Sequence, residues 1–98
     1  MKIAINGFGR IGRTFLRSLL SDPEASSKLE VVAINVGPTS KEQGAHLFKY
    51  DSTFGTFDKK VSYSNGSMTV NGHTIELIQE KDPVNLPWAK LGVDVVVE

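Results

Sequence analysis

The 98-residue sequence predicts an α/β fold in which an antiparallel β-meander is added to a parallel sheet. A short apolar run breaks into Gly-x-Gly-x-x-Gly and then into helical periodicity, and a second apolar run follows about 20 residues later. Further along the chain, two Asn-Gly pairs separate runs that alternate with a period of two. The first pattern is typical of a strand-helix-strand unit, and the second is typical of hairpins.

Length and composition predict one small domain, residues 1–98, with a single core. The 11 basic and 11 acidic residues cancel, so nothing indicates a nucleic-acid groove or an anionic membrane surface. The absence of cysteine excludes disulfides, cysteine-ligated metals and a thiol nucleophile within this chain. No apolar run approaches the roughly 18 residues of a membrane span, and no leader pattern precedes the first strand. We therefore expect a cytoplasmic protein.

The first strand, residues 2–6, leads into a glycine turn suited to a phosphate. Gly7 can take the sharp turn, Gly9 leaves the backbone open to a pyrophosphate, and Gly12 lets the helix pack closely on the strand. A helix that begins at Arg10 presents free N–H groups and its positive dipole end to an anion. This context predicts the first mononucleotide-binding half of a Rossmann-type, doubly wound parallel sheet.

The remaining elements follow from periodicity and turn chemistry. The first helix should end near Ser21, because Asp22-Pro23 is a turn signal and proline cannot continue a helix. Residues 29–36 are almost all apolar, as expected of a strand buried on both faces. Thr39 or Ser40 is expected to cap a helix over residues 41–49, and residues 50–58 are expected to form a loop.

The second half of the chain is predicted to be mostly β. The three runs of the meander are residues 60–64, 67–70 and 73–79, joined by Asn65-Gly66 and Asn71-Gly72. After a loop with Asp82-Pro83 and Leu86-Pro87, residues 93–98 are predicted to form a last strand.

Several separate stretches resemble, in order, the start of phosphorylating glyceraldehyde-3-phosphate dehydrogenase. They are INGFGRIGR, VVAIN, KYDSTFGTF, QEKDP, LPWAKLG and VDVVVE. The resemblance covers the whole chain and implies the NAD(P)-binding domain of a glycolytic, tetrameric, cytoplasmic enzyme. That enzyme oxidises an aldehyde through a cysteine thiohemiacetal, passes hydride to NAD(P), and phosphorolyses the thioester to an acyl phosphate.

Members of that family are several times longer than this chain, and their catalytic cysteine and its histidine partner lie beyond residue 98. The resemblance therefore implies an incomplete NAD(P)-binding domain without the catalytic domain, inactive by itself. His46 and His73 are no substitutes, because there is no cysteine for either to activate. We also expect self-association, because the last strand would leave an apolar edge unpaired.

The resemblance also implies a set of cofactor-binding residues and no metal site. They are Asn6, Gly7, Phe8, Gly9, Arg10, Ile11, Gly12, Asn35, Val36 and Lys81. Backbone N–H groups of Arg10 and Ile11 are expected to bind the phosphates, and Arg10 to add side-chain charge. Lys81 stands where many members carry an arginine near the adenine, and Phe54 replaces a histidine common in that motif. Arg13 and Arg17 are expected to contact solvent or another subunit.

The end of the second strand departs from the dinucleotide fingerprint. A carboxylate is expected about 20 residues after the glycine turn, where it would bind the ribose hydroxyls and repel a 2′-phosphate. Here Asn35 and Val36 occupy that position, and only Thr39, Ser40 and Lys41 are near enough in sequence to bind a 2′-phosphate. We expect NAD to be used, with reduced discrimination against NADP.

The sequence leaves two alternatives open. Erythrose-4-phosphate dehydrogenase shares this amino-terminal pattern, and only the catalytic half would separate the two enzymes. A stand-alone nucleotide-binding module without catalysis is the second alternative.

Overall fold

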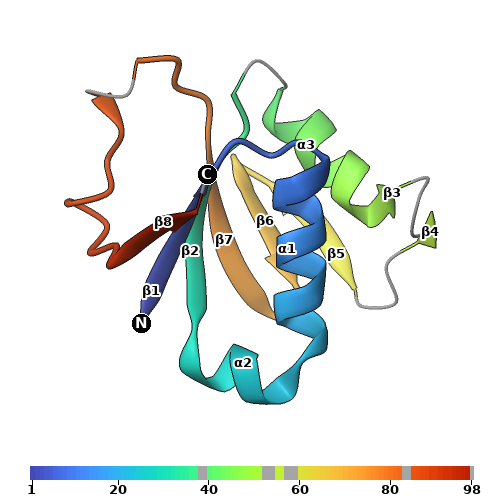
Figure 1. The fold of residues 1–98 in the computed structure, drawn as a ribbon. Helices are drawn as coiled ribbons and strands as arrows, with labels where there is room; N and C mark the ends of the chain where they lie inside the picture. Colours follow the sequence, from blue (N-terminus) through green and yellow to red (C-terminus); the bar gives the residue numbers. More distant parts are fainter. Residues whose placement is uncertain (38–39, 52–54, 57–59, 83–84, 98) are drawn as a thin grey trace.

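The computed structural model describes residues 1–37, 40–51, 55–56, 60–82 and 85–97, which form a six-stranded sheet with helices packed on it (Figure 1). The helices are α1 (Arg10–Ser21), α2 (Pro23–Lys28) and α3 (Lys41–Lys49). The strands of the sheet are β1 (Lys2–Asn6), β2 (Glu30–Asn35), β5 (Val61–Ser64), β6 (Ser67–Val70), β7 (His73–Ile78) and β8 (Val95–Val97). Two short strands, β3 (Tyr50–Asp51) and β4 (Gly55–Thr56), pair only with each other.

The order of the strands is β5-β6-β7-β2-β1-β8, and the four strands from β7 to β8 run parallel. The chain leaves β1 toward β2 and later returns to β8 on the other side of β1 (Figure 1). In open parallel sheets, ligands bind beyond the carboxyl ends of the strands where the order reverses in this way. The predicted α/β fold is confirmed. A ligand is therefore expected to bind at the carboxyl end of β1.

The predicted meander is also confirmed, and it continues the parallel sheet. Strands β5, β6 and β7 pair antiparallel, while β7 pairs parallel with β2. In the two turns, Asn65 and Gly66 have φ of 53° and 79°, and Asn71 and Gly72 have φ of 50° and 87°. Positive φ at both central positions is the requirement that makes Asn-Gly the preferred hairpin sequence.

The core lies between the sheet and the helices. Leu16 and Leu19 of α1 are buried together with Ile5 of β1 and Ile34 of β2. From α3, Phe48 is fully buried, and its ring centroid lies 5.9 Å from that of Phe8 in the glycine turn. The apolar stripes of α1 and α3 are therefore buried, as the helical spacing predicts, whereas α2 has no buried residue.

Arg17 of α1 is hydrogen-bonded to the end of α3. Its Nη2 donates to the carbonyl oxygens of Phe48 and Lys49 at 2.9 and 3.4 Å. Arg13 is likewise half-buried, and its Nη1 donates to the carbonyl of Phe8 at 3.0 Å. Both arginines are thus bonded within the chain, which the sequence did not predict, and their expected contacts with solvent or another subunit stay a prediction.

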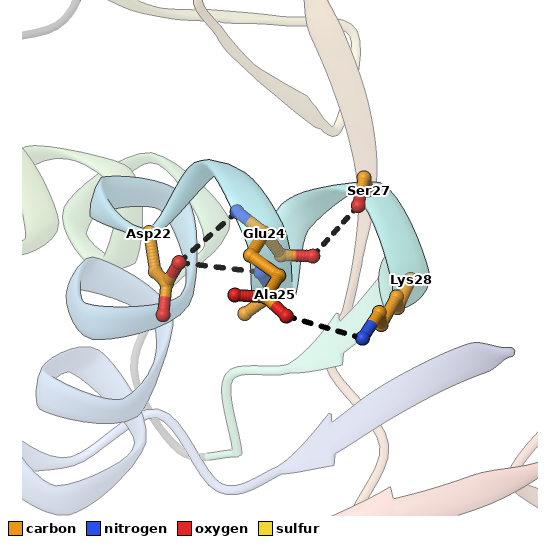
Figure 2. Close-up of polar contacts among 5 residues, drawn as sticks. All are labelled: Asp22, Glu24, Ala25, Ser27 and Lys28. Carbon is orange, nitrogen blue, oxygen red and sulfur yellow. Dashed lines mark hydrogen bonds and ion pairs between the residues drawn. The ribbon is translucent and has the colours of Figure 1, made fainter.

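Helix α2 was not predicted from the sequence. Helix α1 ends at Ser21 as expected, but Asp22 then caps a second helix with Pro23 in its first turn. Figure 2 shows Asp22 Oδ1 accepting the N–H groups of Glu24 and Ala25 at 3.0 and 3.3 Å. At the other end, Lys28 Nζ lies 3.3 Å from Glu24 Oε1 in an exposed i,i+4 pair. Asp-Pro here is a helix start, since proline suits the first helical turn.

Other boundaries differ by one or two residues. Strand β2 is one residue shorter at each end than the strand expected over 29–36, and β8 begins two residues later than the strand expected over 93–98. The loop expected over 50–58 contains β3 and β4. The departure at Phe54 and the capping role of Thr39 lie outside the described residues. No helix within the described ranges is both long and apolar enough to cross a membrane.

The contact between α1 and β1 yields the first prediction. A Cβ on Gly12 would lie 2.5 Å from the Gly7 carbonyl oxygen and 3.2 Å from Ile5 Cγ2, so backbone would have to move. We expect Gly12→Ala to lower the free energy of unfolding by about 1–3 kcal/mol, measured by urea denaturation.

Gly9→Ala is the matched control for this prediction. A Cβ there would meet nothing within 4 Å, and Gly9 has an ordinary φ of −80°. Its stability should stay within about 0.5 kcal/mol of the parent, because the poorer N-cap is offset by the lower entropy of the unfolded chain. Equal stability of Gly12→Ala and the parent would contradict the close approach.

Candidate cofactor site

The glycine turn joins β1 to α1 at the carboxyl edge of the sheet. Gly7 has a φ of +103°, which glycine adopts without strain, and its N–H donates to the Asn35 carbonyl at 2.9 Å. Gly9 is extended and forms the N-cap of α1, and its carbonyl accepts the N–H of Arg13 at 3.0 Å. The turn is therefore fixed to β2 on one side and to α1 on the other.

The amino end of α1 carries no side-chain cap. The first N–H groups of an α-helix have no intrahelical partner, so those at the start of α1 are free to bind an acceptor. A Cβ at Gly9 would meet nothing within 4 Å, which leaves open space against the backbone at this point. We call this open space, at Gly9 and the uncapped start of α1, the cradle. A pyrophosphate fits it, because its oxygens accept N–H groups and its negative charge interacts favourably with the positive end of the helix.

Two arginines, Arg10 and Arg13, lie in the first turn of α1, which contains no acidic residue. Cations at the amino end of a helix interact unfavourably with the helix dipole. An anion bound there would interact favourably with both arginines and with the dipole. Arg13 also holds the turn in place through its bond to Phe8. The sequence pattern predicted no such role for Arg13, although two arginines in an acid-free first turn are a signal that could have indicated it.

Asn35 is a buried polar residue at the end of β2, with 5% of its surface exposed. Its Nδ2 donates to Asn6 Oδ1 at 3.0 Å and to the Glu80 carbonyl at 2.8 Å. Its Oδ1 accepts the N–H groups of Gly37 and Glu80 at 3.2 and 3.1 Å. The side chain is thus bonded to three segments of the protein.

Val36 follows Asn35 but faces the core. It is 3% exposed, and its Cγ1 lies 3.0 Å from the point where a Cβ on Gly44 of α3 would stand. Phe8, which is 6% exposed, packs in the same cluster. A cofactor contact from Phe8 or Val36 therefore has to come from the backbone, and these two residues stay predictions as binding residues.

Lys81 lies at the same edge of the sheet. Its neighbour Glu80 is bonded to Asn35 through both its N–H and its carbonyl, and Lys81 itself is exposed. Arg10 is exposed as well, and Ile11 is 79% exposed. The structure therefore brings the glycine turn, the end of β2 and the Lys81 segment together, with Arg10, Ile11 and Lys81 open to solvent.

The residues that the sequence offered for binding a 2′-phosphate make other contacts in the structure. The Ser40 hydroxyl caps α3 by accepting the N–H of Gln43 at 3.1 Å. The Nζ of Lys41 lies 3.5 Å from the Cβ position of Gly66, so this side chain lies along the turn between β5 and β6. Thr39 is outside the described residues.

Neither histidine is part of this site. His73 Nε2 donates to the Val31 carbonyl at 3.0 Å, and the ring centroid of His46 lies 4.9 Å from that of Tyr50. In the part of the chain that the structure describes, no three or more His, Asp or Glu side chains are grouped to hold a metal ion. A surface hollow of about 630 Å³ lies at the opposite edge of the sheet, where Met1, Lys28 and His73 are among its lining residues.

Comparison with known proteins gives the same assignment. The family described as "Glyceraldehyde 3-phosphate dehydrogenase, NAD binding domain" matches residues 1–98. Glyceraldehyde-3-phosphate dehydrogenase 1 of Kluyveromyces lactis is 50% identical over 98 residues, and the corresponding protein of Borreliella burgdorferi is 51% identical over 98 residues. These matches cover 100% of this chain, and 29% and 28% of the two relatives.

A third relative, the glyceraldehyde-3-phosphate dehydrogenase of Clostridium acetobutylicum, is 52% identical over 97 residues, which are 99% of this chain and 28% of that protein. The chain therefore spans under a third of the length of the relatives that it matches. With its glycine turn, its uncapped helix start and its mixed sheet, this chain belongs to the family of glyceraldehyde 3-phosphate dehydrogenase NAD-binding domains.

Proposed function

We propose that this chain binds NAD for the phosphorylating oxidation of glyceraldehyde 3-phosphate. The observation that carries the proposal is the open cradle at Gly9, set against the uncapped amino end of α1. The names of the relatives support the reaction, which is proposed here because the chain spans only 29% and 28% of the length of these relatives.

The residues divide the work of holding the cofactor. N–H groups of Arg10 and Ile11 would bind the pyrophosphate, and the exposed Arg10 guanidinium would add charge. Lys81 would lie on the adenosine side of the site. NAD, when bound, supplies the hydride acceptor, while the protein supplies position and charge. A lysine at position 81 keeps that charge but lacks the planar fork of arginine.

The whole enzyme is proposed to be a cytoplasmic homotetramer of glycolysis, with an aldehyde as substrate and an acyl phosphate as product. Its thiol nucleophile is not among these 98 residues, which contain no cysteine. Because the relatives carry the name glyceraldehyde-3-phosphate dehydrogenase, neither the erythrose-4-phosphate enzyme nor a module without catalysis is favoured. Self-association of the chain through the edge of β8, where Val95 is exposed, stays a prediction.

For cofactor choice, we propose NAD with reduced discrimination against NADP. Position 36 carries valine, so no carboxylate repels a 2′-phosphate there. A strong clamp for that phosphate is not supported either, because the Ser40 hydroxyl caps α3 and Lys41 lies along another turn. Removing repulsion without adding a clamp lowers the preference for NAD but does not reverse it.

Gly9→Ala tests the cradle directly. The added methyl group would occupy the space through which the pyrophosphate approaches the backbone, so we expect NAD affinity to fall at least about tenfold, or about 1.4 kcal/mol. Isothermal titration calorimetry on the protein as its gene encodes it measures this change. Unchanged affinity in a variant that folds normally would show that the pyrophosphate binds elsewhere.

Val36→Asp tests the cofactor preference. The new carboxylate would replace a side chain that is 3% exposed and packs beside Phe8. We expect the unliganded variant to lose about 2 kcal/mol or more of stability, with NAD restoring more of it than NADP does. Thermal shifts with each cofactor measure this, and Val36→Thr controls for lost packing without charge. If the parent already excludes NADP as strongly as Val36→Asp, residue 36 does not determine the preference.

The chain by itself is expected to lack dehydrogenase activity, because a positioned cofactor cannot replace the nucleophile that forms the covalent intermediate. Cofactor reduction is measured with glyceraldehyde 3-phosphate and phosphate. A rate that follows the 98-residue chain through purification would refute this expectation.

A further inference from the structure

The side chain of Asn35 uses its full hydrogen-bonding capacity within the protein. A primary amide has two donor hydrogens and an oxygen with two acceptor sites, and all four positions have partners at 2.8–3.2 Å. With 5% of its surface exposed, Asn35 has little capacity left for a ligand. A functional contribution from this residue must therefore act through the groups that it binds.

Those groups belong to three segments at the carboxyl edge of the sheet. Asn6 is the last residue of β1 and is paired in register with Asn35 of β2. Gly37 lies in the segment that follows β2, and Glu80 lies just beyond β7. The strand pairing itself places Asn6 and Asn35 side by side, so one amide can reach both neighbours of β2.

Backbone bonds of residues 35 and 36 act in the same direction. The Asn35 carbonyl accepts the N–H of Gly7, and the N–H of Val36 donates to the Ile78 carbonyl at 2.7 Å. The glycine turn is thus bonded to the backbone of Asn35, while the segment that carries Lys81 is bonded to its side chain. The distance between the two segments depends on this residue.

We propose that Asn35 is a positioning residue that holds Lys81 at a set distance from the glycine turn, so that one ligand can meet both. The inference rests on the proposed function, because it concerns the binding of the adenosine and pyrophosphate parts of NAD. Asn35 was expected to contact the cofactor itself, and the inference assigns it an indirect part instead.

The charges around Lys81 explain why its position matters. Glu80 and Asp82 flank it, and a segment free to turn would present these carboxylates to the phosphates as readily as the ammonium group. In the structure, Glu80 Oε1 accepts the N–H of Asp82 at 3.1 Å, and the Glu80 backbone is bonded on both sides to Asn35. The two bonds to Asn35 restrict the rotation of this segment, and with it the direction of the Lys81 side chain.

The chemistry of the site demands an amide. In Asn35→Asp the carboxylate would place an acceptor against the Glu80 carbonyl, which cannot donate in return. In Asn35→Ala the Glu80 N–H and carbonyl lose their partner and the segment is released. The second variant adds no charge, so it isolates the loss of position.

A double-mutant cycle tests the inference on the protein as its gene encodes it. The variants are Asn35→Ala, Lys81→Met and the double variant, and NAD dissociation constants are measured by calorimetry at two salt concentrations. We expect Lys81→Met to weaken NAD binding about fivefold in the parent and less than about twofold in the Asn35→Ala background. In the Asn35→Ala background, the salt dependence that Lys81 contributes to NAD binding should also vanish.

Met68→Ala in β6 is the matched stability control, because Met68 is fully buried and belongs to the meander. It should lower the melting temperature yet keep the whole effect of Lys81→Met. If Asn35→Ala does not fold, Asn35→Ser replaces it in the same cycle with the same expected loss of coupling.

The outcomes separate the two proposals. A parent protein that binds no NAD overturns the proposed function. A parent that binds NAD, with equal effects of Lys81→Met in both backgrounds, overturns the positioning role of Asn35 and leaves the proposed function standing.

Discussion

The contact between Gly12 and the Gly7 carbonyl is the constraint on which the site depends. A Cβ at position 12 would stand 2.5 Å from that oxygen, so the first turn of α1 lies against the chain that leaves β1. The N-cap of this turn, Gly9, has no side chain, and a Cβ there would meet nothing within 4 Å, so the space beside the helix start stays open. The anion cradle follows from the packing of α1 on β1, with Arg10 and Arg13 adding charge beside it.

Asn35 joins this cradle to the rest of the sheet. Parallel strands place their carboxyl ends at one edge, but hydrogen bonding within the strands does not fix the segments that follow them. Here a buried amide bonds to the end of β1, the start of the segment after β2 and the backbone of Glu80. Arg10 and Lys81 are 71 residues apart in sequence, and the segments that carry them are both bonded to Asn35.

The elements of the fold could be predicted because each has a local cause, such as the Asn-Gly pairs of the hairpins or the apolar run of β2. Helix α2 was missed because Asp22-Pro23 is both a turn signal and a helix start, and only the bonds to Glu24 and Ala25 distinguish the two. The inward direction of Val36 was missed because it depends on Gly44 of α3. Binding atoms supplied by the backbone follow a sequence motif, whereas side-chain direction depends on tertiary packing.

If NAD binds as proposed, its pyrophosphate lies at the amino end of α1. Backbone amide shifts in an isotope-labelled protein, followed by NMR as NAD is added, test it most directly. We expect the largest changes at Gly9, Arg10 and Ile11, with smaller changes at Lys81. Changes concentrated at the opposite edge of the sheet, around Lys28 and His73, with Arg10 and Ile11 unmoved, would contradict it.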